Sequence, residues 1–168
     1  LDDLKRMSRM IDDMLFLAKA DNGLITPGHQ QVALEDLVNK LFEYYRLVAD
    51  ERGIELQLQG HGNIRGDALM LHRAIANLLS NALRYTPEGR TITVSICQNN
   101  RVIELSVANP GSKIADEHLE QLFDRFYRAD PARREGNNNN AGLGLAITRS
   151  IVTAHQGKIN CTSVAGLT

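Results

Sequence analysis

The 168-residue sequence has no tryptophan, only two cysteines, and 5% aromatic residues. So few aromatic side chains argue against a base-stacking platform for single-stranded nucleic acid, and a formal net charge of −1 argues against a basic nucleic-acid-binding surface. No apolar run approaches the roughly 20 residues that span a bilayer. Cys97 and Cys161 lack the spacing of metal ligands, and their apolar, strand-like contexts predict buried free thiols. What remains is an ordinary globular composition, sufficient for one domain with an appendage.

Residues 1–20 carry an apolar stripe with alternating spacings of three and four residues. The stripe consists of Leu4, Met7, Ile11, Met14 and Ala18. Leu1, Leu15 and Leu17 widen it beyond a two-stranded seam, as in one helix of a four-helix bundle. The alternative is a helix packed on its own domain. Residues 22–30 contain glycine and proline and predict a linker, and we expect the chain to begin inside a helix of a longer protein.

The remaining chain, residues 31–168, alternates strand and helix patterns. Strands are predicted at residues 31–34, 54–59, 91–98, 102–108 and 158–163, and helices at residues 35–52, 67–83, 116–126 and 143–154. Residues 128–141 are polar, include four consecutive asparagines, and predict a loop. Because a hairpin joins two of the strands while helices separate the others, we predict an α+β fold. It is a two-layer sandwich with a mixed sheet and helices on one face.

The helix predicted from Asp67 carries an unusual polar stripe. Asn77 and Asn81 stand four residues apart, and Arg84 and Tyr85 follow three and four residues after Asn81. These spacings place the four side chains on one helix face. Amide oxygens suit Mg²⁺, and a guanidinium matches a phosphate. The alternative is that both asparagines bond to neighbouring backbone.

Three further elements could carry chemistry. Asn109-Pro110-Gly111 directly follows a predicted strand, although a simple turn explains it equally well. Gly142-Leu143-Gly144-Leu145 opens a helix and leaves its backbone N–H groups free for phosphate. Residues 122–128, Leu-Phe-Asp-Arg-Phe-Tyr-Arg, precede the polar loop, and their two phenylalanines also suit a core. A helix, a polar loop and a glycine-opened helix together have the anatomy of a lid over a nucleotide.

In this order, the four elements resemble the N, G1, F and G2 boxes of the ATP-binding domain of sensor histidine kinases. Gly166-Leu167-Thr168 resembles the family's terminal Gly-x-Gly-Thr, with Leu167 in place of glycine. Residues 1–21 resemble the second helix of its dimerisation and phosphotransfer hairpin. The F box and the Asn-Pro-Gly form of the G1 box resemble the heavy-metal-sensing subgroup. The resemblance implies the Bergerat ATP-binding fold.

The resemblance implies roles for the matched residues. Asn81 would ligate Mg²⁺, Asn77 and Arg84 would contact phosphates, and Tyr85 would pack on the adenine. Arg128 is a candidate for contacting the γ-phosphate, so that Asn77, Arg84 and Arg128 form the implied catalytic set.

The remaining matched residues would bind the base and close the site. Asn109 stands where most members have an aspartate that accepts from the adenine amino group. Gly111 and Ile114 would line the base pocket, and Thr168 would support the adenine contact. Gly142, Leu143, Gly144 and Leu145 would close the phosphate end. Two departures are Asn140 at the first glycine of the G2 box and Lys113 where the G1 loop commonly has glycine.

The predicted function is therefore the ATP-binding catalytic portion of a two-component sensor histidine kinase. It would bind Mg-ATP and transfer the γ-phosphoryl group to a histidine, for relay to a response-regulator aspartate. No segment resembles the helix that carries the accepting histidine. An ATPase of the same fold is the first alternative, but such enzymes carry a glutamate where this chain has Asn77. A non-catalytic scaffold without ATP binding is the second alternative.

The resemblance also implies partners and a location. We expect a receiver domain as partner and a homodimer through the hairpin of the full-length protein, with the present chain mainly monomeric. We expect no nucleic acid, and membrane contact only through segments outside this chain, which would be the cytoplasmic portion of a bacterial inner-membrane protein. Residues 129–141 are expected to gain order when nucleotide binds.

Overall fold

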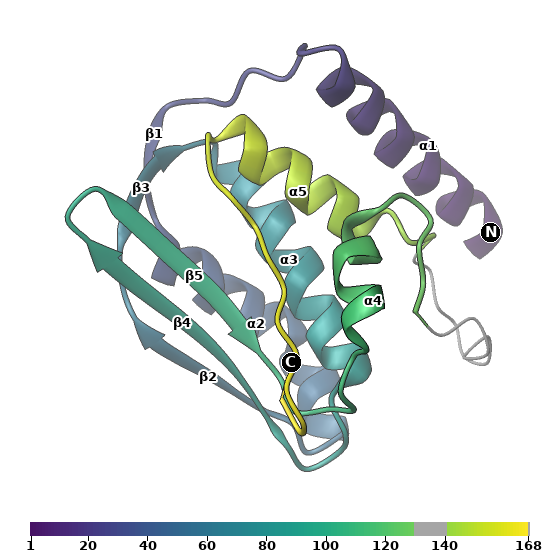
Figure 1. Ribbon diagram of the computed structural model, residues 1–168, viewed down its shortest axis with the longest axis vertical. Helices are drawn as coiled ribbons and strands as arrows, with labels where there is room; N and C mark the ends of the chain where they lie inside the picture. The colour runs from purple at the N-terminus through teal and green to yellow at the C-terminus, as the bar shows by residue number, and fades with distance from the viewer. Residues whose placement is uncertain (130–140, 168) are drawn as a thin grey trace.

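A computed structural model describes residues 1–129 and 141–167, and Figure 1 shows the arrangement of its elements. The helices are α1 (Asp2–Asp21), α2 (Leu34–Glu51), α3 (Ala68–Tyr85), α4 (Asp116–Leu119), the 3₁₀-helix η1 (Glu120–Phe123) and α5 (Gly144–Ala154). The strands are β1 (Gln30–Ala33), β2 (Glu55–Gly60), β3 (Asn63–Gly66), β4 (Thr91–Asn99) and β5 (Val102–Ala108). Thr168 and residues 130–140, which make up most of the loop predicted over residues 128–141, lie outside the described residues.

Strand β4 is the centre of a mixed three-stranded sheet. It pairs in parallel with β2 and antiparallel with β5, in the order β2-β4-β5. Asn100, in the turn of the β4–β5 hairpin, has a φ of 47°, a backbone region that asparagine adopts more readily than most residues. Strands β1 and β3 form a separate antiparallel pair. The predicted mixed sheet is confirmed.

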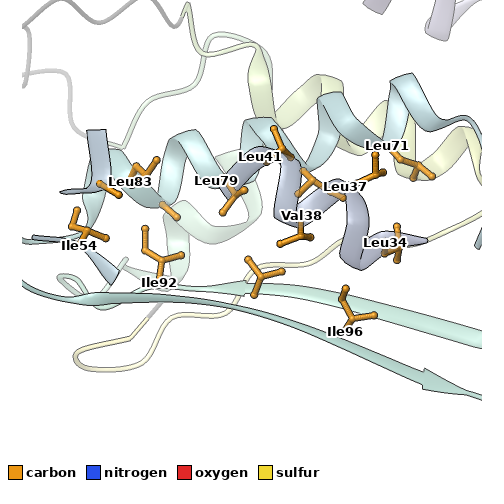
Figure 2. Packing of buried hydrophobic residues seen from close by; sticks show 14 of the residues in the cluster. Leu34, Leu37, Val38, Leu41, Ile54, Leu71, Leu79, Leu83, Ile92 and Ile96 are labelled. Atoms are coloured by element: carbon orange, nitrogen blue, oxygen red, sulfur yellow. The ribbon is translucent and has the colours of Figure 1, made fainter. Parts of the chain in front are cut away.

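The core lies between this sheet and the helices on one of its faces. Ile92, Val94 and Ile96 alternate along β4 and are all buried, because every second residue of a strand faces the same side. They pack against side chains from α2 and α3, including Val38 and Leu79 (Figure 2). Helices α2 and α3 cover one face of the sheet, α5 packs on α3, and α1 packs on α5 on the side away from the sheet (Figure 1). The α+β sandwich is confirmed.

Some local predictions were wrong. Residues 158–163 are not a strand, because an extended chain needs a ladder partner, and among residues 1–129 and 141–167 β5 pairs only with β4. The helix predicted over residues 116–126 ends early: α4 passes into the 3₁₀-helix η1 after Leu119, and the backbone becomes extended at Asp124, where ψ is 149°. Strand β3 was not predicted. Cys97 is exposed, because it alternates with Ile96 and lies on the outer face of β4.

Helix α1 packs on α5 with one face and exposes the other. Leu17 is 2% exposed and packs in a cluster with Leu143 and Ile147. The Arg73 guanidinium of α3 lies over the Phe16 ring, 4.8 Å from its centroid. The predicted heptad residues Leu4, Met7, Ile11 and Met14 are at least 50% exposed. The alternative, a helix packed on its own domain, therefore describes the face with Leu17, while the helix-bundle role of the exposed face stays a prediction. No helix in the described part of the chain has the length and apolarity needed to cross a bilayer.

Asp67 fixes the N-terminus of α3 and connects three parts of the chain. Its carboxylate accepts hydrogen bonds from the N–H groups of Met70 (3.0 Å) and of Gly28 in the predicted linker (2.9 Å). Its own N–H donates to His155 Nε2 (3.0 Å), while His155 Nδ1 lies 2.8 Å from the carbonyl oxygen of Ile151. A neutral ring protonated on Nδ1 satisfies both contacts. The predicted linker, α3 and the end of α5 thus meet at Asp67, the first through its carboxylate and the last through its backbone N–H.

The bonds from Gly28 and Met70 hold the pKa of Asp67 below its ordinary value, the first contributing most. We predict that Asp67→Ala lowers the free energy of unfolding by about 1 kcal/mol at pH 7, because it removes an N-cap. A carboxylate with a lowered folded-state pKa stabilises the protein above its unfolded-state pKa, and this contribution is lost as the pH falls through the folded-state value. The difference in free energy of unfolding between the wild type and Asp67→Ala should therefore begin to decrease below about pH 4.

The measurement is urea unfolding of the wild type and of Asp67→Ala, each at pH 7 and at pH 3. Asp67→Asn is the matched control, because an amide oxygen still caps the helix but does not titrate in this range. A difference between wild type and Asp67→Ala that is the same at both pH values would contradict the prediction.

Candidate functional site

Helix α3 has one buried apolar face and one polar stripe. Leu71, Ile75, Leu79 and Leu83 are at most 9% exposed and form the apolar face. Asn77, Asn81 and Arg84 are half-buried on the other side, and Tyr85 is 44% exposed. The Arg84 guanidinium lies 5.5 Å from the centroid of the Tyr85 ring. The predicted stripe is thus accessible while the helix stays anchored.

The two asparagines of this stripe differ in their surroundings. Asn77 Nδ2 donates to the carbonyl oxygen of Gly144 (3.0 Å) and lies 3.4 Å from Thr148 Oγ1, so Asn77 holds the first turn of α5 against α3. Thr148 is buried and also donates to the Gly144 carbonyl (2.8 Å). The side chain of Asn81 makes no hydrogen bond to any residue that the structure describes. Its amide oxygen is therefore an open acceptor in the middle of the stripe.

A metal ion at this stripe would depend on oxygen donors of this kind. Within residues 1–129 and 141–167, no three His, Cys, Asp or Glu side chains are grouped to hold a metal ion. One amide oxygen, completed by phosphate oxygens and water, suits Mg²⁺, which keeps most of its own waters and accepts hard oxygen ligands. The chemistry of Asn81 therefore fits that cation.

The end of β5 brings Asn109 and Gly111 beside the end of α3. Asn109 is only 9% exposed, and its Nδ2 donates to the Pro110 carbonyl (3.2 Å). A Cβ on Gly111 would lie 3.5 Å from the carbonyl oxygen of Tyr85 and 3.8 Å from Asn109 Nδ2. The Ile114 N–H donates to Ser163 Oγ (2.9 Å), which fixes this turn to the C-terminal segment. Tyr85, Asn109 and Gly111 therefore form one end of the site.

The F-box and G2-box segments meet at a second point. The Phe126 N–H donates to the Gly142 carbonyl (3.0 Å). Gly142 has a φ of +77°, and a Cβ there would lie 3.0 Å from the Phe126 backbone, so glycine is required by both conformation and space. Arg128 is half-buried two residues beyond Phe126. Leu143 is 1% exposed and belongs to the cluster with Leu17.

The predicted site residues therefore gather in two groups along α3. One group is Tyr85, Asn109 and Gly111, and the other is Asn77 with Gly144, next to the Phe126–Gly142 contact. Leu145, half-buried, follows Gly144 at the start of α5. Thr168 lies outside the described residues, so its role stays a prediction.

The sequence analysis missed some residues that support this site. Thr148 was not singled out, although its position four residues after Gly144 is a spacing at which a threonine hydroxyl can bond back to a helical carbonyl. His118 was also missed, and its Nδ1 is hydrogen-bonded to the Tyr127 hydroxyl, next to Arg128. Nothing local in the sequence signals this second contact, because it joins α4 to the F box.

Comparison with known proteins identifies the family. The family model described as histidine kinase-, DNA gyrase B-, and HSP90-like ATPase matches residues 66–168. The chain is 49% identical over 166 residues to the sensor histidine kinase CusS of Escherichia coli (strain K12), covering 98% of this chain and 34% of CusS. It is 51% identical over 142 residues to the sensor protein CopS of Pseudomonas syringae pv. tomato, covering 84% of this chain and 29% of CopS.

A solved structure agrees with the fold. The Acinetobacter baumannii histidine kinase AdeS superposes with a TM-score of 0.82 at 20% sequence identity, over 98% of this chain and 75% of that one. The chain spans about a third of the length of the curated relatives named above. The resemblance drawn from the four motifs is confirmed, and the chain belongs to the family of histidine kinase-, DNA gyrase B- and HSP90-like ATPases.

Proposed function

We propose that this chain is the ATP-binding catalytic portion of a sensor histidine kinase, which binds Mg-ATP. The observation that carries the proposal is the position of Asn81. Its amide has no partner among the described residues, and it lies on α3 between the group around Tyr85 and the group around Asn77. A nucleotide that spans both groups would have its base at Asn109 and its phosphates near Asn81.

The chemistry is transfer of the γ-phosphoryl group from ATP to a histidine. The bond between the γ-phosphorus and the bridging oxygen breaks, a bond to an imidazole nitrogen forms, and ADP leaves. The protein contributes mainly position and charge to such a reaction. Arg84 and Arg128 would pair with phosphate oxygens, and Asn81 would hold Mg²⁺, which neutralises phosphate charge when bound.

A neighbouring function, hydrolysis of ATP, is less well supported. An ATPase of this fold needs a general base that activates water one helical turn before the metal-binding asparagine. That position is Asn77, whose amide does not accept a proton near pH 7 and whose Nδ2 is bonded to Gly144. The name of one relative, the sensor histidine kinase CusS, also favours phosphoryl transfer to protein.

The same proposal includes partners. The phosphohistidine would pass its phosphoryl group to an aspartate of a response-regulator receiver domain. The exposed stripe of Leu4, Met7, Ile11 and Met14 supports dimerisation through α1 and the rest of its hairpin in the full-length protein. We infer a cytoplasmic portion of a bacterial inner-membrane protein, attached through segments outside these 168 residues. The heavy-metal-sensing subgroup stays a prediction.

We predict that the 168-residue chain binds ADP and ATP in the presence of Mg²⁺ but does not phosphorylate itself. The two groups along α3 are present, whereas no segment resembles the helix that carries the accepting histidine. Calorimetric titration with Mg-ADP tests binding, and γ-labelled ATP tests transfer. Asn81→Ala should reduce Mg-dependent binding. Acid-labile label on the chain would contradict the second half, and absence of nucleotide binding would favour the scaffold alternative.

We predict that Asn109→Asp binds ADP several-fold more tightly and discriminates better against GDP. An amide presents both a donor and an acceptor, whereas a carboxylate only accepts and therefore favours the adenine amino group. Hydrogen bonds to charged groups exceed neutral ones by roughly 1 kcal/mol, which is several-fold in affinity.

Calorimetry of both nucleotides against both variants checks this prediction. Asn160→Asp makes the same chemical change at an exposed position and should leave both affinities unchanged. Since Asn109→Asp also removes the bond to the Pro110 carbonyl, thermal unfolding is measured separately. An unchanged ratio of ADP to GDP affinity would show that this side chain does not read the base.

A further inference from the structure

Arg52, immediately after α2, reaches across to the end of α3. Its Nη2 donates to the carbonyl oxygen of Thr86 (2.6 Å), and its Nη1 donates to the carbonyl oxygen of Leu83. Its own carbonyl oxygen accepts from the Gly89 N–H (3.0 Å). One half-buried arginine therefore joins the turn after α2 to the turn after α3 through three hydrogen bonds.

The two carbonyl groups that Arg52 binds stand on either side of Arg84 and Tyr85. The last carbonyl groups of a helix have no partner within the helix, and a cation placed there interacts favourably with the helix dipole. The planar guanidinium can bridge two acceptors, which a lysine ammonium does with less directional control. Arg52 therefore fixes the backbone on both sides of the two residues that end the polar stripe.

The side chains of Arg84 and Tyr85 have little else to hold them. Tyr85 is 44% exposed, and among the described residues neither side chain makes a hydrogen bond or an ion pair. The Arg84 guanidinium lies 5.5 Å from the centroid of the Tyr85 ring. Thr86 is 1% exposed, and its N–H and hydroxyl both donate to the Ala82 carbonyl (2.9 and 2.6 Å). The direction in which the Arg84 and Tyr85 side chains point therefore depends on the backbone between Leu83 and Thr86.

We propose that Arg52 is a positioning residue of the nucleotide site, which holds Arg84 and Tyr85 ready for the phosphate and the base. The role rests on the proposed function. Arg52 bonds to backbone carbonyl groups at the end of α3 and acts on the ligand only through Arg84 and Tyr85. Without it, both side chains would have to be ordered when the nucleotide binds. Complete ordering of two such side chains would lower the affinity about five- to 150-fold. Because Thr86 keeps its two bonds to the Ala82 carbonyl, loss of Arg52 frees them only in part, and we expect a loss of about three- to tenfold.

The experiment compares ADP affinity, by calorimetry, of Arg52→Gln and Arg52→Lys with that of the unmodified chain. We expect Arg52→Gln to bind about three- to tenfold more weakly and Arg52→Lys to fall between the two, because lysine keeps the charge without the fork. Arg46→Gln is the matched control, since Arg46 is exposed on α2, the helix that Arg52 follows, and the affinity of this variant should not change. All titrations are made well below each variant's unfolding temperature.

A second control separates positioning from stability. Val38→Ala removes methyl groups from a fully buried core position on α2 and should lower the unfolding temperature without changing the affinity of the folded protein. Amide hydrogen exchange without nucleotide gives an independent reading. Arg52→Gln should speed exchange at the Arg84, Tyr85 and Thr86 amides more than at the start of α3.

The outcomes separate the two proposals. No nucleotide binding by the unmodified chain overturns the proposed function and the role of Arg52 with it. Normal binding by the unmodified chain and equal binding by Arg52→Gln overturns the role of Arg52 alone. A loss of affinity in Val38→Ala as large as in Arg52→Gln also overturns it, as does unchanged amide exchange at residues 84–86.

Discussion

The burial of one face of α3 is the constraint on which the rest of the structure depends. Leu71, Ile75, Leu79 and Leu83 must be covered by the sheet and α2, or the helix cannot stay in place. In folded proteins, most of the stability of a helix comes from packing of its apolar face rather than from its own helix propensity. Because that packing uses one side of the helix, the opposite side is free to carry Asn77, Asn81, Arg84 and Tyr85. The polar stripe is therefore rigid without contributing to the core.

Both ends of α3 are fixed by side chains from distant parts of the sequence. At its N-terminus, the Asp67 carboxylate accepts a hydrogen bond from the Gly28 N–H, and the Asp67 N–H donates to the His155 ring. At its C-terminus, Arg52 binds two carbonyl groups. Unpartnered groups at helix ends are places where a helix frays, so these contacts keep the first and last turns ordered. The last turn is the one that carries Arg84 and Tyr85.

What could be predicted from the sequence follows from what is encoded locally. The spacing of Asn77, Asn81 and Arg84 fixes their common face regardless of the surroundings, because a helix has 3.6 residues per turn. The turn at Phe126 and the pairing of β3 with β1 depend on partners far away in the sequence, and no periodicity reveals them. The same holds for residues 158–163, whose alternation predicts an extended chain but cannot supply a pairing partner. The contacts of Arg52 could not be predicted from the sequence for the same reason, because its partners, Leu83 and Thr86, are distant along the chain.

Helix α1 is held against α5 by few contacts. Leu17 is its one buried side chain within the described residues, and burying a leucine contributes about 1.5–3 kcal/mol. The ion pairs Asp13–Arg73 and Asp21–Arg125 involve partly exposed side chains, so water and salt screen them and each adds little. Leu143, which packs in the cluster with Leu17, stands between Gly142 and Gly144. Undocking α1 would uncover Leu17 and the partly buried Met10 and Phe16, and with them the backbone segment that we propose closes the phosphate end.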